Sequence, residues 1–164
     1  MHHSSLKLMH KLLSKYVPSG MTVADCGSFD HGAGLGYRES CVSLGLGYVG
    51  IDIESGANVD LVVSEQAKDW GQELRTTFDV VISGQVLEHV RMPWLWIAQL
   101  ASLLKPDGIG IIIAPNTWTF HEYPIDCWRV WPDGMQGLFD FAQLRTIEVG
   151  MVYHDTFGVF GFGE

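Results

Sequence analysis

Residues 23–36 read VADCGSFDHGAGLG, and this stretch decides the fold. A short apolar run contains Asp25 and gives way at Gly27 to a chain rich in glycine. This pattern is typical of a buried parallel strand whose C-terminal end opens into a ligand-binding turn. Glycine lets the backbone reach positive φ and approach a ligand closely, and the following helix directs its first N–H groups toward the turn. We therefore expect a binding site directly after this strand.

Two classes of ligand compete for this turn, dinucleotides and S-adenosylmethionine. A dinucleotide brings a pyrophosphate, which a carboxylate in the turn repels, and its usual acid lies about 20 residues further along. Here Asp25 precedes Gly27 by two residues and Asp30 follows closely. S-Adenosylmethionine carries an ammonium and a sulfonium, so nearby carboxylates are favourable. The acids favour S-adenosylmethionine, and a turn that binds nothing is the alternative, because glycine-rich motifs are weak signals alone.

The composition is that of a globular chain. Its 164 residues suit one domain with a full core, which we expect to span residues 1–164. Hydrophobic residues make up 47% and charged residues 18%, which argues against disorder. The net charge of −9 disfavours a general nucleic-acid surface, because such a surface needs clustered Lys and Arg.

Cysteine usage and apolar runs bear on the compartment. Cys26, Cys41 and Cys127 are odd in number and lack zinc-binding spacing, so we expect a reducing cytoplasmic setting and no bound metal. No apolar run approaches the roughly 20 residues of a membrane span, and the first residues lack a signal-peptide pattern. We expect no membrane partner, and the sequence leaves the oligomeric state open.

Apolar runs and helical periodicity alternate along the chain. Residues 1–20 are expected to form a packing helix that ends at Pro18-Ser19-Gly20. Five strands are expected, at Thr22–Cys26, Tyr48–Asp52, Val59–Val63, Phe78–Ser83 and Ile109–Ala114. Further helices are expected from Tyr37 to Leu44, around Trp70 and Leu74, and from Pro93 onward. The core face of this last helix is predicted to be Trp96, Ile97, Leu100, Leu103 and Leu104, before a turn at Lys105–Gly108.

Strands that alternate with helices indicate an α/β fold. We predict a doubly wound, mostly parallel, Rossmann-like sheet with helices on both faces. Residues 115–137 break this pattern with aromatic, proline and polar residues, so we expect an irregular segment there. The runs Gln143–Val152 and Thr156–Phe162 are expected to pair as an antiparallel hairpin at the sheet edge.

Ligands of open α/β sheets bind outside the carboxyl ends of the strands. Asp52 ends the second strand, where its carboxylate can accept two hydrogen bonds from a ribose diol. A solvated turn acid is the alternative for Asp52. Ile53 beside it offers an apolar surface to adenine, and Ser64 and Glu65 end the third strand, where an adenine amino group needs an acceptor.

Four ordered segments together resemble the class I S-adenosylmethionine-dependent methyltransferases: Val23–Gly27, Tyr48–Asp52, Phe78–Val90 and Leu103–Gly108. The pieces Leu-Glu-His-Val at 87–90 and Leu-Lys-Pro-Asp-Gly at 104–108 are similar to the small-molecule branch. Residues 121–130 are similar to a segment of members associated with sugar or cell-envelope pathways. The order and spacing of the segments, over most of the chain, are more specific than any one motif.

The resemblance implies S-adenosylmethionine as the methyl donor and S-adenosylhomocysteine as the product. By position, Gly27 and Ser28 would hold the methionine part, with Asp25 nearby, and Asp52 would hold the ribose. Ser83, Gly84 and Gln85 would lie along the cofactor. The chain departs from the usual pattern in two places. Residues 27–32 read GSFDHG in place of a closely spaced glycine triplet, and Ser64 stands where an acid is common.

His89 and His121 are the candidate catalytic residues. His89 follows the fourth strand, and its ordinary pKa of about 6.5 suits a general base at neutral pH; a packing or capping role at a helix start is its alternative. His121, with Asp126, lies beyond the fifth strand, where an acceptor pocket is expected. Methyl transfer is an in-line displacement that positioning can largely supply, so it does not require a base.

The same irregular segment holds the candidate acceptor-binding residues. Aromatic faces can stack a sugar or ring, and an arginine can clamp an anionic acceptor. The alternative is that the aromatic residues close the end of a small core. The acceptor-binding candidates are Trp118, His121, Tyr123, Trp128 and Arg129.

Methyl transfer to a small or glycan-linked acceptor is the function that we expect. Two alternatives stay open. One is a binding module that keeps the fold and the cofactor but lacks turnover. The other is a nicotinamide-dependent oxidoreductase, against which Asp25 and the lack of a Tyr-x-x-x-Lys pair count.

Overall fold

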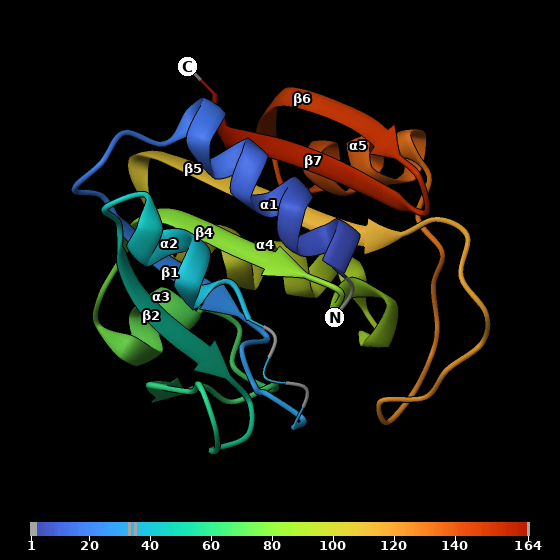
Figure 1. Cartoon of the computed structure of the whole chain (residues 1–164), viewed down its shortest axis with the longest axis horizontal. Coiled ribbons are helices and arrows are strands. Elements are labelled where there is room, and N and C mark those ends of the chain that lie inside the picture. Colours follow the sequence, from blue (N-terminus) through green and yellow to red (C-terminus); the bar gives the residue numbers. More distant parts are fainter. Residues whose placement is uncertain (1–2, 33, 35, 164) are drawn as a thin grey trace.

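The computed structural model describes residues 3–32, 34 and 36–163 (Figure 1). The N-terminal half contains α1 (His3–Tyr16), β1 (Thr22–Cys26), α2 (Arg38–Ser43), β2 (Gly47–Asp52), β3 (Leu61–Val62), α3 (Trp70–Leu74) and β4 (Phe78–Gly84). The C-terminal half contains a 3₁₀ turn, η1 (Leu87–His89), and then α4 (Pro93–Ser102), β5 (Leu104–Pro115), α5 (Pro132–Phe141), β6 (Leu144–Val152) and β7 (Asp155–Phe162).

One seven-stranded sheet runs through the described residues, in the order β3-β2-β1-β4-β5-β7-β6. The first five strands of this order are parallel, and β7 is antiparallel to both β5 and β6. The expected doubly wound, mostly parallel sheet with an antiparallel C-terminal hairpin is confirmed. The hairpin reaches the sheet through β7, which leaves β6 as the edge strand.

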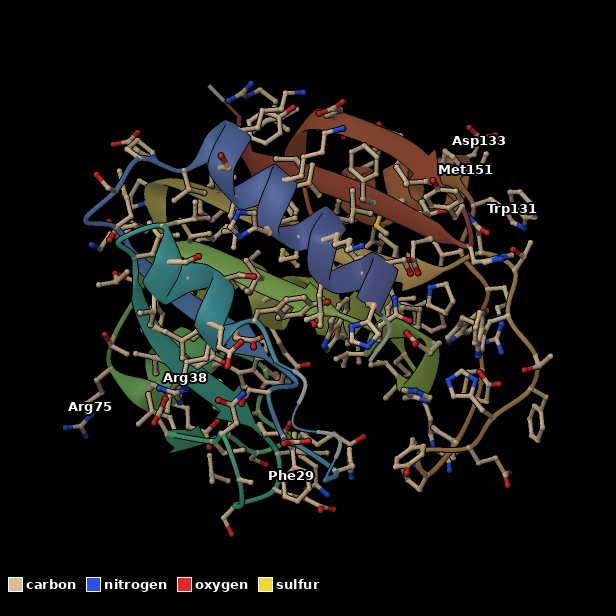
Figure 2. All side chains as sticks on the ribbon, in the orientation of Figure 1. Phe29, Arg38, Arg75, Trp131, Asp133 and Met151 are labelled. Carbon is tan, nitrogen blue, oxygen red and sulfur yellow. The ribbon has the colours of Figure 1, made fainter. Side chains whose placement is uncertain are left out.

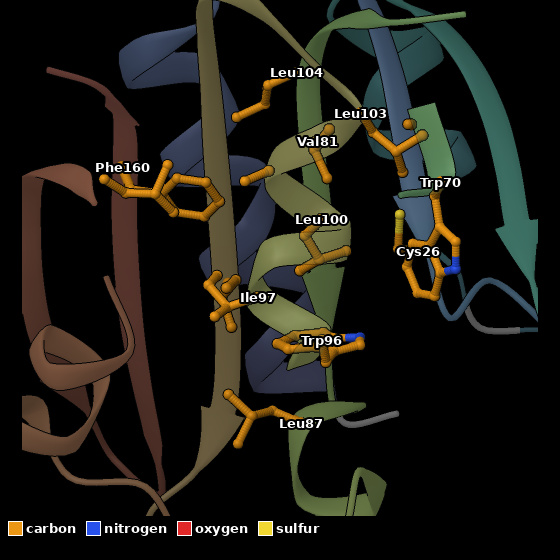
Figure 3. Close-up of a cluster of buried hydrophobic side chains, with 14 of the residues drawn as sticks. Cys26, Trp70, Val81, Leu87, Trp96, Ile97, Leu100, Leu103, Leu104 and Phe160 are labelled. Atoms are coloured by element: carbon orange, nitrogen blue, oxygen red, sulfur yellow. The ribbon is translucent and has the colours of Figure 1, made fainter. Parts of the chain in front are cut away.

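Helices cover both faces of the sheet, and each face has its own core (Figure 1). Successive side chains of β4 point to opposite faces of the sheet. Val80 and Ile82 therefore belong to the core under α1 and α2, while Val81 belongs to the core on the opposite face. Figure 3 shows this second core, where Trp96, Ile97 and Leu100 of α4 pack among strand residues. The burial of both faces explains why the strands read as continuous apolar runs.

The N-terminal helix packs as expected. Leu8, Met9, Leu12 and Leu13 are buried on one face of α1, and the hydroxyls of Ser5 and Tyr37 lie 2.8 Å apart in a buried hydrogen bond. Among the described residues, no helix combines the length and the apolar character that a bilayer span requires.

Several element boundaries differ from the prediction. The strand expected at Val59–Val63 spans only Leu61–Val62. Residues 132–137 were expected to be irregular, but Pro132 begins α5; proline suits a first helical turn, and buried Met135 and Phe139 supply the packing that offsets Gly134 and Gly137. The expected turn at Lys105–Gly108 lies within β5, which already begins at Leu104. Leu104 pairs with Phe78 across an irregularity in register, so it belongs to the sheet and not to the face of α4.

Candidate functional site

A cavity of about 1140 Å³ opens at the carboxyl ends of the parallel strands. The chain passes from β1 to β2 on one side and β4 lies on the other, so this is the point at which the strand order reverses. Most of the sequence-predicted cofactor residues line this cavity: Asp25, Gly27, Ser28, Asp52, Ile53, Glu65, Gly84 and Gln85. Two of them, Ser64 and Ser83, lie outside the described residues that line it.

The turn after β1 depends on glycine. Gly27 has φ +88°, and a Cβ atom there would lie 2.2 Å from Cγ2 of Val86. The N–H groups of Gly27 and Ser28 both donate to the carbonyl oxygen of Ile51, at 2.9 and 3.2 Å. These bonds fasten the turn to β2, so Gly27 meets both a conformational and a steric requirement. Figure 2 shows Phe29 near the tip of this turn.

Asp25 is a buried acid at the base of the cavity. It is 2% exposed, and the hydroxyl of Tyr48 donates to its Oδ2 at 2.6 Å. Burial raises the pKa of Asp25 to about 7, against the lowering effect of the Tyr48 hydrogen bond. A cationic ligand at this position would favour the ionised carboxylate.

Asp52 is held by backbone donors. Its Oδ2 accepts from the N–H of Phe29 at 2.9 Å, and its Oδ1 accepts from the N–H groups of Ile53 and Glu54 at 2.7 and 3.3 Å. Because a carboxylate offers about four acceptor positions, fewer are free for a ribose diol than in an isolated carboxylate. Asp52 therefore also fixes the turns after β1 and β2.

The two serines outside the cavity bond within the protein. Ser83 is buried and its hydroxyl donates to the carbonyl oxygen of Cys26 at 2.6 Å. The Ser64 carbonyl accepts from the indole N–H of Trp70 at 2.9 Å. Next to it, the side-chain amide of Gln99 donates to the carbonyl of Glu65 at 3.1 Å, so α4 positions the loop that follows β3.

The segment 116–131 follows the carboxyl end of β5 (Figure 1). Hydrogen bonds fasten it to η1 and to Val90 directly after it. The N–H of Cys127 donates to the carbonyl of Glu88 at 2.7 Å, and the indole N–H of Trp128 donates to the carbonyl of Val90 at 2.7 Å. The ring Nδ1 of His89 lies 2.5 Å from the carbonyl oxygen of Ile125. These contacts hold the segment against the cavity.

The acceptor-binding candidates divide into two groups. His121 and Tyr123 line the cavity, whereas Trp118, Trp128 and Arg129 lie outside the described residues that line it. Trp131, at the end of the segment, is labelled beside the start of α5 in Figure 2.

Arg129 directs all five of its N–H donors into its own segment. Two pair with the Asp126 carboxylate at 2.6 and 2.7 Å. The other three reach the carbonyl oxygens of Trp118, Thr119 and Trp128 at 3.0, 3.0 and 2.7 Å. This arrangement stabilises the segment and leaves no donor for an anionic acceptor.

The two candidate catalytic histidines meet at the cavity. The ring centroids of His89 and His121 are 5.1 Å apart, and Tyr123 lies 6.5 Å from His89. Burial lowers the pKa of His89 below its ordinary value, so the ring is neutral at pH 7. Its Nδ1 faces a carbonyl, which only accepts, so Nδ1 carries the proton and Nε2 is left as a base or a ligand.

Glu88 is a site residue that the sequence did not single out as functional. It is completely buried, yet it lines the cavity, and among the described residues neither carboxylate oxygen has a hydrogen-bond partner. Burial raises its pKa to about 7. The Leu-Glu-His-Val motif contained it, but the motif alone does not reveal that the carboxylate is buried without a partner. Phe29, His31 and Pro124 also line the cavity.

Solved methyltransferase structures share this architecture. The Burkholderia thailandensis 1,6-didemethyltoxoflavin-N1-methyltransferase, with bound 1,6-didemethyltoxoflavin and S-adenosylhomocysteine, matches with a TM-score of 0.72 at 15% identity, over 99% of this chain and 78% of that chain. A SAM-dependent methyltransferase from Aquifex aeolicus matches with a TM-score of 0.67 at 16% identity, over 98% of each chain. The fold is that of the class I S-adenosylmethionine-dependent methyltransferases.

The chain belongs to the methyltransferase-domain family, whose family model matches residues 7–149. Its relatives include two proteins named ubiquinone biosynthesis O-methyltransferase. The one from Xanthomonas euvesicatoria pv. vesicatoria is 32% identical over 63% of this chain and 48% of its own length. The one from Xanthomonas axonopodis pv. citri is 36% identical over 56% of this chain and 41% of its own length. The chain thus matches less than half the length of these relatives.

Proposed function

We propose that this chain transfers the methyl group of S-adenosylmethionine to a small-molecule acceptor. The observation that carries the proposal is that one cavity is lined both by the β1 turn with Asp52 and by the pair His89 and His121. A methyltransferase needs these two functions in contact, because donor and acceptor must meet in line. At about 1140 Å³, the cavity exceeds the usual range of about 300–1,000 Å³ for a single-ligand pocket, which supports two occupants.

The charge of the cavity fits a cationic cofactor. Among the described lining residues, acids outnumber Lys and Arg: Asp25, Asp30, Asp52, Glu65 and Glu88 stand against Lys68 and Arg91. A low-dielectric cleft with this excess attracts a cation. When bound, S-adenosylmethionine supplies an electrophilic methyl group on a positively charged sulfur. We assign the methionine part of the cofactor to Asp25, Gly27 and Ser28. Its ribose and adenine are assigned to Asp52 and Ile53, and Gly84 and Gln85 are expected to lie along the bound cofactor.

The histidines are placed to handle the acceptor proton. As the acceptor oxygen or nitrogen forms its bond to the methyl carbon and the carbon–sulfur bond breaks, the acceptor must lose a proton. His89 presents an unprotonated Nε2, and the ring of His121 lies beside it in the cavity wall. Methyl transfer by positioning alone stays compatible with this arrangement, in which case the rings orient the acceptor.

We infer that the acceptor is a small ring compound that carries a hydroxyl or a ring nitrogen. The curated relatives are named as O-methyltransferases of ubiquinone biosynthesis, and a neighbour of known structure is an N-methyltransferase. Aromatic side chains in the cavity wall support the same class, since they stack on flat rings: Phe29, Trp70, Trp96 and Tyr123. A glycan-linked acceptor, which Tyr123 and His121 also suit, is the second candidate.

Calorimetry followed by a turnover assay tests the proposal. S-Adenosylhomocysteine should bind the purified chain and raise its melting temperature, while NAD should do neither. The chain is then incubated with S-adenosylmethionine labelled in the methyl group and with a catechol, a ring-nitrogen heterocycle or a glycan extract. Label in one of the first two acceptors supports the proposal, and label in the glycan fraction alone overturns the inferred acceptor class. Cofactor binding without label in any acceptor favours a binding module, and stronger binding of NAD favours an oxidoreductase.

A further inference from the structure

Glu88, His89 and His121 form a cluster that the proposed methyl transfer does not fully explain. Each offers one ligand atom, and the three atoms lie within 4.8 Å of one another. Glu88 and His89 are neighbours on η1, and His121 comes from the segment 116–131, which backbone bonds fasten to η1. All three line the cavity.

The Glu88 carboxylate is the unusual member. Its residue is 0% exposed, and among the described residues neither oxygen has a hydrogen-bond partner. Within the described part of the chain, Nε2 of His89 lies 3.8 Å from Oε1 of Glu88. Arg129 interacts with the Glu88 carboxylate only by longer-range electrostatic attraction, because all five Arg129 N–H donors are hydrogen-bonded to other groups. Burying an unpaired carboxylate is costly unless a cation or a donor joins it.

The histidines are held in the form that binds metal. Nδ1 of His89 lies 2.5 Å from the carbonyl of Ile125, and Nδ1 of His121 lies 3.1 Å from the carbonyl of Thr119. A carbonyl only accepts, so both Nδ1 atoms carry the proton and both Nε2 atoms keep a lone pair. A ring N–H that donates to a backbone carbonyl is the usual support of a metal-binding histidine, because it fixes the tautomer and the ring orientation.

We propose that Glu88, His89 and His121 bind a divalent transition-metal ion, with the remaining coordination positions open to the cavity. Two imidazoles and one carboxylate suit Zn²⁺, Fe²⁺ or Co²⁺ better than Mg²⁺, which prefers oxygen ligands. Ligand atoms of a tetrahedral site with bonds of about 2.1 Å lie roughly 3.4 Å apart. The ion therefore draws the three side chains somewhat closer than the 4.8 Å limit within which they lie. The cysteine spacing gave no reason to expect this site, because none of its ligands is a cysteine.

The ion has a role in the reaction, and this part of the inference rests on the proposed function. An acceptor hydroxyl that occupies an open coordination position loses its proton more readily, as metal-bound water does. Its oxygen then reaches the donor as an anion, and the released proton passes to solvent. Neither histidine needs to act as a general base in that case, since both hold the ion.

Cobalt titration of the full chain, without cofactor or acceptor, tests the binding. Co²⁺ should bind with one equivalent and give the visible absorption of a tetrahedral or five-coordinate site, and Zn²⁺ should displace it. Glu88→Gln and His121→Ala should each weaken Co²⁺ binding at least about tenfold. The matched control is His154→Ala, because His154 is an exposed histidine outside the cluster. His2 and His3 are present in every variant, so any background binding at the N-terminus cancels.

Glu88→Gln keeps the size of the side chain and removes a buried charge, so this variant should fold; its melting temperature and circular dichroism check that. Equal Co²⁺ binding by the wild type, Glu88→Gln and His121→Ala overturns the site, as does the absence of binding at millimolar Co²⁺ and Zn²⁺. Neither result depends on turnover, so failure of the proposed function is seen separately. In a chain that does methylate an acceptor, full activity after chelation overturns the activating role of the ion.

Discussion

Two acids at adjacent strand ends, Asp25 and Asp52, differ because their surroundings differ. Asp25 is buried, which raises its pKa to about 7 against the lowering effect of the Tyr48 hydroxyl. Asp52 sits at the cavity surface, where three backbone N–H groups donate to it. The sequence predicts the position of both acids, since each ends an apolar run, but their environments depend on neighbours from other elements. The same holds for Glu88, whose burial without a partner no local pattern reveals.

Asp52→Ala should weaken the binding of S-adenosylhomocysteine at least tenfold. A charge-assisted hydrogen bond is worth about 1.5–3 kcal/mol, and about 1.4 kcal/mol corresponds to a factor of ten in affinity. The substitution also frees the N–H groups of Phe29 and Ile53, which loosens the turns and adds to the loss. Isothermal titration calorimetry measures the effect.

The control for this experiment is Asp107→Ala, which removes an exposed acid near the start of β5, away from the cavity. Asp107→Ala should bind S-adenosylhomocysteine with the same affinity as the wild type. Unchanged affinity in a folded Asp52→Ala variant would remove Asp52 from the cofactor site.

At the scale of elements, the strands and their order along the chain were predictable, and so was an irregular segment after β5, but the packing of residues 116–131 was not. Apolar runs that end in acids or glycine mark β1, β2 and β4 because both faces of the sheet are buried. The segment owes its place to long-range bonds instead, such as the one from Cys127 to the carbonyl of Glu88. No local periodicity encodes such a bond. The prediction also missed α5, because glycines in its sequence obscured the helical pattern.

Arg129→Ala should destabilise the protein by about 1.5–3 kcal/mol, the worth of hydrogen bonds to a charged partner. The loss leaves the Asp126 side chain, which is 2% exposed, without its guanidinium, and it frees three backbone carbonyls. Chemical denaturation measures the free energy of unfolding. Arg129→Lys should recover only part of the loss, because an ammonium cannot make the same planar set of contacts. A melting curve identical to that of the wild type would instead return Arg129 to the acceptor-binding candidates.

At the scale of the whole molecule, the sheet brings together at one edge cavity-lining residues that are spread over about 100 positions of the sequence, from Asp25 to Pro124. The turn after β1, the end of β2, η1 and the segment 116–131 all reach the same cavity. The rule that ligands bind at the carboxyl ends of strands predicted that most of the candidate cofactor residues would meet at one cavity. The candidate acceptor-binding residues were predicted only as a segment. Which of their side chains face the cavity and which stabilise the segment depends on tertiary contacts. Buried acids in the cavity also link its occupancy to the stability of the entire fold.

The pH dependence of unfolding tests this link through Asp25. Burial raises its pKa from 3.8 to about 7, with Asp52 adding to the rise while the Tyr48 hydroxyl and Arg38 oppose it. The folded state then binds a proton that the unfolded state has released, so this group's contribution to stability is full below pH 4 and is lost as the pH rises toward 7. The slope for one proton is about 1.4 kcal/mol per pH unit.

The experiment measures the free energy of unfolding of the wild type and of Asp25→Asn between pH 4.5 and 7.5, without ligand. The difference between the two proteins isolates the contribution of Asp25, because the contributions of all other groups cancel. S-Adenosylhomocysteine, whose ammonium favours the ionised carboxylate, should bind the wild type more tightly as the pH rises through this window and flatten the slope. A parallel pH dependence in the two proteins would show that Asp25 is already ionised in the folded state.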